Sequence, residues 1–259
     1  MIKPIDILNF LTPQSGYSKT ADIRYGDDAR QQLDLYRPKN AIEGPLLIFI
    51  YGGAWREGAK EDYEFVGEAF SSEGYTIAIP DYRLFPQVGY PHIIDDVQQA
   101  IEFIRSNTDK LDIDARRMVI IGHSSGAHSA AMLVSSDRYY RESSFINALV
   151  GISGPYDLPL ELAEVNEVFR NVDQPSSVKP PELVVSGHPP TLLLHGSDDK
   201  RVKPEHTERY QPKLLDANVN TEVIFMEDVG HVDIIAGVAS RLEFLNATKN
   251  HIIEFLEVL

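Results

Sequence analysis

One segment, Met118 to Leu133, constrains this chain more than any other stretch. It runs from the apolar and mostly β-branched Met118-Val119-Ile120-Ile121 through Gly122-His123-Ser124-Ser125-Gly126 into good helix formers. Taken alone, G-x-S-x-G is also an ordinary turn of small residues. A buried strand before it and a helix after it are typical of a nucleophile elbow. We therefore expect the Ser124 hydroxyl at the carboxyl end of that strand, with the N–H of Ser125 pointing to the same place.

The remaining chain alternates strand-like and helix-like segments. After a short helix at 2–11, alternating residues at 21–25 and 32–36 predict an antiparallel hairpin. Further strands are expected at 46–51, 75–79, 118–121, 148–152, 191–194 and 221–226, and helices at 61–72, 92–104, 204–217 and 239–258. This order predicts an α/β fold, a single domain over 1–259 whose mostly parallel eight-stranded sheet has helices on both faces. Residues 155–190 are richer in proline and lack a period, so we expect a cap-like excursion there.

Composition limits the kinds of partner that the protein can bind and the cellular compartments in which it is expected. The chain has 24 basic and 39 acidic residues, a net charge of −15, which disfavours nucleic acid. It has no cysteine, which excludes disulfides, Cys-ligated zinc and thiol nucleophiles. Neither a signal peptide nor an apolar run of the ~20 residues that a bilayer requires is evident. A cytoplasmic protein without membrane contact is the expectation, unless a leader has been removed, and a homodimer stays open.

Two glycines follow the strand predicted at 46–51, in the run Tyr51-Gly52-Gly53-Ala54-Trp55. Glycine lets a chain turn tightly and bring its backbone N–H groups near a ligand. Acyl transfer passes through an oxyanion, which fixed backbone donors stabilise. We therefore assign the N–H groups of Gly53, Ala54 and Ser125 to an oxyanion hole; the alternative is a plain turn at a strand end.

Carboxylates and a histidine follow the last two predicted strands. Asp198 and Asp199 come after the first of them, and His231 comes after the second. A carboxylate can hold a histidine in one tautomer, and the histidine can take a proton from a serine and return it to a leaving group. Asp199 is the first choice and Asp198 the alternative. Because ligands of such sheets bind beyond the carboxyl ends of the strands, we expect Ser124, Asp199 and His231 to meet there as a catalytic triad.

No metal or other cofactor is expected. His195 and Asp198 lie three residues apart, but a third ligand at helical or turn spacing is not evident, and we reject a zinc site. The sequence also lacks a glycine-rich phosphate loop and a nucleotide-binding fingerprint. His123 and His128 flank the candidate nucleophile, and packing or lining a wall is the expected role of both.

Motifs spread over most of the chain resemble those of one enzyme family. Besides the G-H-S-S-G turn they are Asp34-Leu35-Tyr36-Arg37-Pro38, Gly52-Gly53-Ala54-Trp55, Asp81-Tyr82-Arg83-Leu84, Tyr90-Pro91, Asp95-Asp96-Val97, Gly154-Pro155-Tyr156-Asp157, His195-Gly196-Ser197-Asp198-Asp199 and Gly230-His231. The chain resembles carboxylesterases of the α/β-hydrolase fold that include feruloyl- and acetyl-esterase-like members. That group is related to the hormone-sensitive-lipase group and to kynurenine formamidase.

The resemblance implies hydrolysis of small esters without a cofactor, through an acyl-enzyme, with Ser124 as nucleophile, Asp199 as acid and His231 as base. One position departs from the family pattern. Tyr51 stands where the family usually has histidine before the two glycines. We expect its phenol to brace the loop and to offer a similar hydrogen bond.

The leading hypothesis is thus a serine carboxylesterase acting on small-molecule short-chain acyl or aryl esters. An arylformamidase would use the same triad, oxyanion hole and base, so the sequence does not separate the two. A catalytically silent binding protein on the same fold is the alternative from another class, although such a protein would be free to lose the triad. Trp55, Phe85, Tyr156 and Phe169 are candidate apolar walls for the substrate; core packing is the alternative for each.

Overall fold

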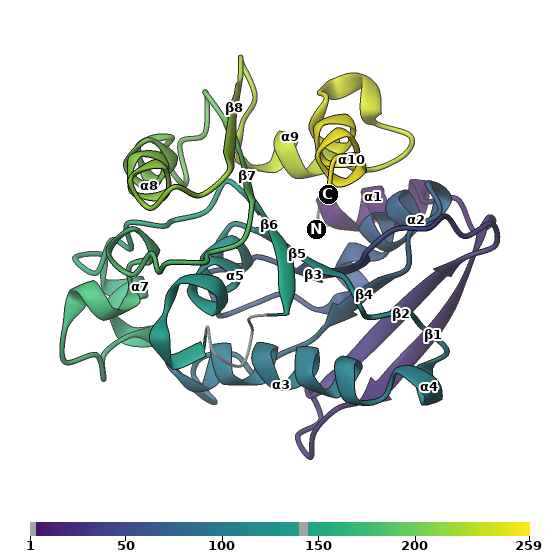
Figure 1. The fold of residues 1–259 in the computed structure, drawn as a ribbon, viewed down its shortest axis with the longest axis horizontal. Coiled ribbons are helices and arrows are strands. Elements are labelled where there is room, and N and C mark those ends of the chain that lie inside the picture. The colour runs from purple at the N-terminus through teal and green to yellow at the C-terminus, as the bar shows by residue number, and fades with distance from the viewer. Residues whose placement is uncertain (1–3, 140–144) are drawn as a thin grey trace.

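The structure, a computed structural model, describes residues 4–139 and 145–259 and is organised around one sheet (Figure 1). The eight strands lie in the order β1-β2-β4-β3-β5-β6-β7-β8. They are β1 (Tyr17–Arg24), β2 (Gln32–Pro38), β3 (Leu46–Ile50), β4 (Ile77–Pro80), β5 (Met118–His123), β6 (Ile146–Ile152), β7 (Thr191–Gly196) and β8 (Thr221–Met226). β2 pairs antiparallel with β1 and β4, and the other pairings are parallel. The predicted hairpin and mostly parallel sheet are confirmed.

Helices cover both faces of the sheet. The α-helices are α1 (Pro4–Leu11), α2 (Glu64–Ser72), α3 (His92–Ser106), α4 (Thr108–Leu111), α5 (Ser125–Ser135), α7 (Ala163–Val168), α8 (Glu205–Asp216), α9 (His231–Ala236) and α10 (Thr248–Glu257). Single 3₁₀ turns are η1 (Lys60–Tyr63), η2 (Pro175–Val178), η3 (Pro180–Glu182) and η4 (Glu243–Leu245). Figure 1 shows α3 and α5 on one side of the sheet and α1, α2 and α10 on the other.

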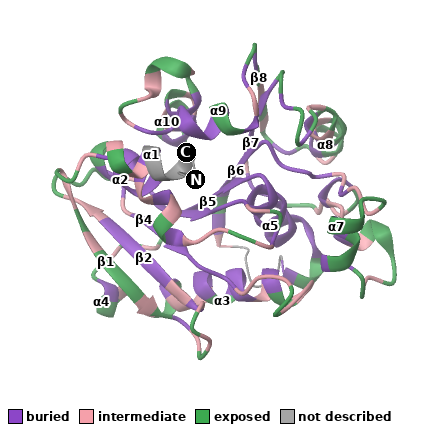
Figure 2. Cartoon of the chain, turned by 180° about the vertical axis from the view of Figure 1, so that it is seen from behind, coloured by how far each residue is buried: buried purple, intermediate pink, exposed green. Residues whose placement is uncertain are grey.

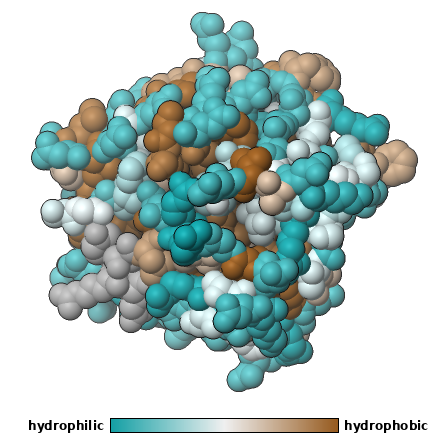
Figure 3. Space-filling view, turned by 45° about the vertical axis from the view of Figure 1, so that its right-hand side comes forward, coloured by the Kyte–Doolittle hydropathy of each residue, from teal (hydrophilic) through white to brown (hydrophobic). Residues whose placement is uncertain are grey.

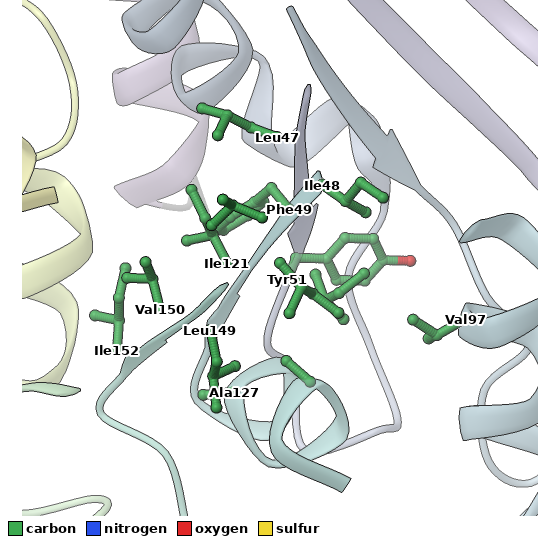
Figure 4. Packing of buried hydrophobic residues seen from close by; sticks show 14 of the residues in the cluster. Leu47, Ile48, Phe49, Tyr51, Val97, Ile121, Ala127, Leu149, Val150 and Ile152 are labelled. Carbon is green, nitrogen blue, oxygen red and sulfur yellow. The ribbon is translucent and has the colours of Figure 1, made fainter. Parts of the chain in front are cut away.

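The apolar runs of the sequence form the core between these layers. Every residue of β3, β4, β5 and β7 is buried, as expected for strands covered on both faces (Figure 2). Figure 4 shows labelled side chains of β3, β5 and β6 gathered along these strands, with Leu149 of β6 on the side of Ala127 in α5. The edge strand β8 is instead partly exposed. On the face drawn in Figure 3, hydrophilic residues predominate and hydrophobic ones form small patches between them.

The predicted helix over 239–258 is confirmed only in its second half. The chain there makes the short turn η4 and only then α10, which begins at Thr248. The interruption centres on Asn246, whose backbone is extended at φ −167°. Its side chain donates to the carbonyl of Asp233 at 2.6 Å and accepts the N–H of Thr248 at 3.1 Å. An asparagine that satisfies backbone groups in this way competes with a continuous helix, and here its oxygen accepts from the N–H of the first residue of α10.

Parallel register brings the strand ends to one edge. Ile50 is opposite Gly122, Gly122 is opposite Gly151, and the pairing continues through β7 to β8. The loops that follow β3, β5, β7 and β8 therefore leave the sheet side by side. These are the loops that carry the glycine pair, the candidate nucleophile, the carboxylates and the histidine.

Buried histidines predict a loss of stability in acid. Burial lowers the pKa of both His128 and His188 to about 4, against ~6.5 in an unfolded chain. Between pH 6.5 and 4 the unfolded chain therefore binds protons that the folded chain does not, so stability falls as pH falls through this window. From pH 7 to 5 we expect a loss of about 2 kcal/mol for each such histidine.

The measurement is the free energy of unfolding from urea titrations at pH 7, 6 and 5. His188→Gln removes one of these titrating groups, so its stability should depend less steeply on pH. Burial raises the pKa of Asp81 and Glu68, which acts in the opposite direction at lower pH. Stability that stays constant or rises between pH 7 and 5 would contradict the prediction.

Candidate active site

The turn after β5 holds Ser124 in an unusual backbone conformation. Its φ is 55° and its ψ is −126°, a region that non-glycine residues rarely adopt. The flanking glycines permit it. A Cβ on Gly122 would lie 2.5 Å from the Cα of Ala127, and one on Gly126 would lie 2.1 Å from the carbonyl oxygen of Ile50. Close approach of strand and helix therefore requires glycine at both positions, and the elbow predicted from the sequence is the geometry observed.

Ser124, His231 and Asp199 form one line of hydrogen bonds. The Oγ of Ser124 lies 2.9 Å from Nε2 of His231, and Nδ1 of His231 lies 2.6 Å from Oδ2 of Asp199. His231 opens α9, and Asp199 follows β7. The structure thus brings together the three residues expected to meet. Ser124 and His231 keep 9% of their surface exposed, whereas Asp199 keeps 3%.

The surroundings of Asp199 keep it ionised. Burial alone would raise its pKa, but the hydrogen bond and charge of His231 and the N–H of Val202 outweigh burial and lower it. Its other oxygen, Oδ1, accepts the N–H groups of Arg201 and Val202 at 3.0 and 2.9 Å. Because a carboxylate only accepts, Nδ1 of neutral His231 donates to it, and Nε2 is left to accept from Ser124. Asp198, the alternative, is exposed and lies 4.0 Å from Lys200.

Backbone donors stand beside Ser124. Gly53, Ala54 and Trp55 all have positive φ, at 132°, 50° and 60°. Within 4–139 and 145–259, the N–H groups of Gly53 and Ala54 donate to no protein acceptor. Ser125 is the first residue of α5, where the leading N–H groups lack intrahelical acceptors. These N–H groups are the ones predicted for an oxyanion hole, and Gly53 lines both cavities described below.

Tyr51 supports the glycine loop through ring stacking and hydrogen bonds. Its ring is stacked between Tyr63 and Tyr82, with centroids 5.4 and 4.7 Å away. Its hydroxyl donates to Oδ1 of Asp81 at 2.6 Å and accepts from Arg30 at 2.8 Å. Figure 4 shows this hydroxyl pointing away from the aliphatic side chains of β5 and β6. The same Arg30 nitrogen donates to the carbonyl of Gly58 at 2.8 Å, so the phenol ties both ends of the loop to one network.

The other histidines have structural partners. His123 lies with its Nε2 3.3 Å from the carbonyl of His231, and burial lowers its pKa to about 3. Nε2 of His128 lies 2.8 Å from the carbonyl of Val178. Both ring nitrogens of His195 are engaged, by the Thr207 hydroxyl and the Val202 carbonyl, each at 2.8 Å. Neither nitrogen of His195 is left for a metal.

Two cavities meet at Ser124. The one we call the His231 cavity has a volume of about 260 Å³ and is lined by His231, Tyr63, Glu57, Asp62 and Leu8 among others. The Trp55 cavity has a volume of about 150 Å³ and is lined mainly by apolar residues, including Trp55, Pro155, Leu158, Leu162 and Val165. Ser124, Gly53 and Arg201 line both. A substrate bound at Ser124 therefore has room on two sides.

Of the apolar walls expected from the sequence, only Trp55 lines a cavity at Ser124. Its indole N–H donates to the hydroxyl of Ser129 at 3.1 Å. Phe169 packs on the Trp55 ring edge-on, with centroids 4.9 Å apart, and so supports the wall from behind. Tyr156 and Phe85 lie elsewhere. Tyr156 is fully buried against Tyr210, and Phe85 packs under the Arg56 guanidinium; neither is among the described residues that line the two cavities.

Several lining residues were not foreseen. Leu8 reaches the His231 cavity from α1, Tyr63 reaches it from η1, and Val232 and Ile235 reach it from α9. Arg201 was not foreseen either, and it lines both cavities at Ser124. Its place two residues after Asp199 was the available signal, because a residue that close to a candidate site carboxylate shares its loop.

Such an arrangement can activate a hydroxyl nucleophile. A neutral histidine that accepts from Ser124 can remove its proton at the moment of attack, and the buried carboxylate stabilises the resulting imidazolium. N–H groups without protein acceptors can bind an oxygen on which negative charge develops.

Among the described residues, none of the helices is long and apolar enough to cross a bilayer.

This chain is similar in sequence to known esterases and to a kynurenine formamidase. The BD-FAE family model matches residues 33–214. "Probable isoprenylcysteine alpha-carbonyl methylesterase ICMEL1" of Arabidopsis thaliana is 30% identical over 240 residues, 82% of this chain and 50% of that protein. Kynurenine formamidase of Salmo salar is 25% identical over 221 residues, 82% of this chain and 73% of that protein. The chain thus spans only half the length of the first relative.

Among solved structures, a truncated form of a carbohydrate esterase from gut microbiota is similar in fold. Its TM-score is 0.77 at 20% sequence identity, and the match covers 92% of this chain and 98% of that one. At this identity the likeness speaks to the fold alone, and it confirms the α/β-hydrolase fold expected from the sequence.

Proposed function

The chain belongs to the BD-FAE family, and from that premise we propose that it is a serine carboxylesterase that hydrolyses short-chain acyl or aryl esters. The observation that carries the proposal is the line of hydrogen bonds from Ser124 through His231 to Asp199, of 2.9 and 2.6 Å. The esterase name of the Arabidopsis relative supports the same class of reaction. The small volume of the Trp55 cavity favours a short acyl group.

In the first half of the reaction the serine becomes acylated. Oγ of Ser124 attacks the ester carbonyl carbon while Nε2 of His231 accepts the hydroxyl proton. The carbonyl electron pair moves onto oxygen, and the N–H groups of Gly53, Ala54 and Ser125 bind this oxyanion. When the oxyanion collapses, the bond to the alcohol oxygen breaks, and His231 gives its proton to that oxygen. The alcohol leaves, and Ser124 carries the acyl group.

In the second half of the reaction, water removes the acyl group from Ser124 through the same steps. His231 accepts a proton from water, whose oxygen attacks the acyl carbon and forms a second oxyanion in the same hole. Collapse breaks the bond to Ser124 Oγ, and His231 returns the proton to it. In both halves of the reaction Asp199 holds His231 in the tautomer protonated at Nδ1. It also stabilises the His231 imidazolium without taking the Nδ1 proton.

An arylformamidase is the second candidate, and the kynurenine formamidase relative is the observation that favours it. The same attack on an N-formyl amide expels an aryl amine, which His231 would protonate. A catalytically silent binding protein is disfavoured because the three side chains keep hydrogen-bonded geometry.

The test is a panel of p-nitrophenyl acetate, butyrate and octanoate with N-formylkynurenine, assayed in the presence of a chelator. We expect acetate and butyrate to be hydrolysed faster than octanoate, because the Trp55 cavity is small. A higher kcat/KM for N-formylkynurenine than for every ester would favour the formamidase. No hydrolysis of any member above the buffer rate would contradict both enzymatic readings.

A further inference from the structure

Arg201 is the cationic side chain that lines both cavities at Ser124, and it also lines a third space. This third space, the outer cleft, has a volume of about 620 Å³. It shares Leu158, Pro159, Leu162, Arg201 and His206 with the Trp55 cavity. The two spaces therefore adjoin, and a chain that leaves Ser124 through the Trp55 cavity reaches the outer cleft.

Two cations that line the outer cleft have no protein partner among the described residues. Arg201 and Lys203 are exposed, and in the described part of the chain no ion pair or hydrogen bond engages their charged groups. By contrast, Lys179 pairs with Asp157 at 2.7 Å, and Arg209 pairs with the same carboxylate. Arg201 holds its position through its backbone, because its N–H donates to Asp199.

Charge differs between the two sides of Ser124. The His231 cavity is lined by two carboxylates, Glu57 and Asp62, and by one cation, Arg201. On the other side the Trp55 cavity has one carboxylate, Glu164, and the outer cleft has five cationic side chains and three carboxylates. The cationic set is Lys179, Lys200, Arg201, Lys203 and Arg209, and the acidic set is Asp157, Glu161 and Glu205. Burial lowers the pKa of His206, which keeps that ring neutral at neutral pH.

The two carboxylates of the His231 cavity therefore repel an anionic group, whereas the cations of the outer cleft attract it. This contrast is local, since the chain as a whole carries −15. Electrostatic attraction at an exposed site is weak at a distance but substantial at contact, and a guanidinium offers two parallel donors that match a carboxylate.

The geometry also indicates which part of an ester lies on which side. His231 must hand its proton to the departing alcohol oxygen, so the alcohol belongs on the side that His231 lines. Ala54 and Ser125 line the Trp55 cavity and His231 does not, so the acyl group belongs there. The side with the excess of cations is thus the acyl side.

We propose that this protein prefers esters whose acyl chain ends in a carboxylate, with the chain in the Trp55 cavity and the carboxylate bound by Arg201 and Lys203 at the outer cleft. The substrate class is a monoester of a short dicarboxylic acid with an uncharged alcohol. The inference rests on the proposed esterase function and names the substrates of that same site.

The test compares 4-nitrophenyl monoesters of glutaric, adipic and suberic acid with the neutral primary amides of equal length. The amide keeps the size and hydrogen-bonding shape of the carboxylate and removes its charge. We expect kcat/KM for the best monoester to exceed that for its amide by about tenfold, mainly through KM, and the advantage to shrink in high salt.

Arg201→Gln should abolish most of that advantage, so the ratio of the two kcat/KM values falls toward one. The Gln variant keeps the backbone N–H that donates a hydrogen bond to Asp199. Arg116→Gln is the matched control, because it changes net charge equally at an exposed side chain that pairs with Asp114 before β5. The control should keep the wild-type ratio.

The outcomes separate the two proposals. Equal kcat/KM for monoester and amide in the wild type, with both hydrolysed, overturns the carboxylate preference and leaves the esterase standing. A preference that Arg201→Gln and Arg116→Gln reduce equally assigns it to net charge and also overturns the inference. Failure to hydrolyse any ester overturns both.

Discussion

Ser124→Ala is expected to lower kcat for p-nitrophenyl butyrate by a factor on the order of 10⁶. Alanine removes the only atom that attacks the carbonyl in the proposed mechanism, and no second hydroxyl lies beside His231 among the described hydrogen bonds. What rate remains would come from the oxyanion hole and from substrate binding, which act without the nucleophile. Initial rates at high enzyme concentration, against a buffer blank, measure the effect.

Folding must be separated from chemistry in that experiment. Ser124 adopts a positive φ, which alanine also tolerates poorly, so the change of side chain leaves the backbone strain in place. We therefore expect a melting temperature close to that of the wild type. Ser177→Ala, in η2, is the matched control; its hydroxyl donates only to the carbonyl of Gln174. Equal loss of activity in both variants would show instability, and retained activity in Ser124→Ala would contradict the nucleophile.

A fluorophosphonate provides the second readout. It phosphonylates an activated serine irreversibly: the serine oxygen bonds to phosphorus and fluoride leaves. Intact wild-type protein should therefore gain one adduct mass, and Ser124→Ala should gain none. Labelling of the alanine variant at another residue would place the reactive hydroxyl elsewhere.

The sequence indicated which side chains meet at Ser124 because each of these contacts rests on a local rule. A sharp strand-to-helix turn requires glycine on both sides of Ser124, and parallel strands carry the loops after β3, β7 and β8 to one edge. The choice between Asp198 and Asp199 stayed open because the two share a loop and a residue type. Only the folded turn after β7 decides it, by directing Asp199 inward and Asp198 toward Lys200.

The walls of the site were harder to predict, because they are assembled from distant segments. Tyr156 and Trp55 are both large aromatic residues near a strand end, but Tyr156 packs into the core against Tyr210. Leu8 and Arg201, which do line the cavities, come from the first helix and from a loop nearly two hundred residues later. No periodicity in either segment signals that they meet.

The break in the predicted 239–258 helix has a similar origin. Leu242 and Leu245 fit a helical stripe with the residues of α10, so periodicity alone favoured one helix. The side chain of Asn246 bonds to the carbonyl of Asp233, thirteen residues earlier, and such a contact is invisible in a local pattern.

Asp199→Asn is expected to lower kcat by about 10³–10⁴ while leaving the fold intact. The amide oxygen can still accept from the N–H groups of Arg201 and Val202, which now bond to Oδ1. The amide nitrogen would then replace Oδ2, 2.6 Å from Nδ1 of His231. Because that nitrogen donates, Nδ1 must accept, and the ring proton moves to Nε2. A protonated Nε2 cannot take the proton of Ser124.

Asp198→Asn makes the same chemical change one residue away and should alter kcat by less than about twofold, since surface substitutions rarely matter. The pair therefore isolates the tautomer of His231 from general effects of lost charge. The two variants differ in stability as well. The lowered pKa of Asp199 means that its ionisation stabilises the fold above the unfolded pKa of ~3.9, and this contribution is lost as pH falls below it. If both variants lose activity equally, or if Asp199→Asn retains wild-type turnover, the carboxylate does not hold His231 in its working tautomer.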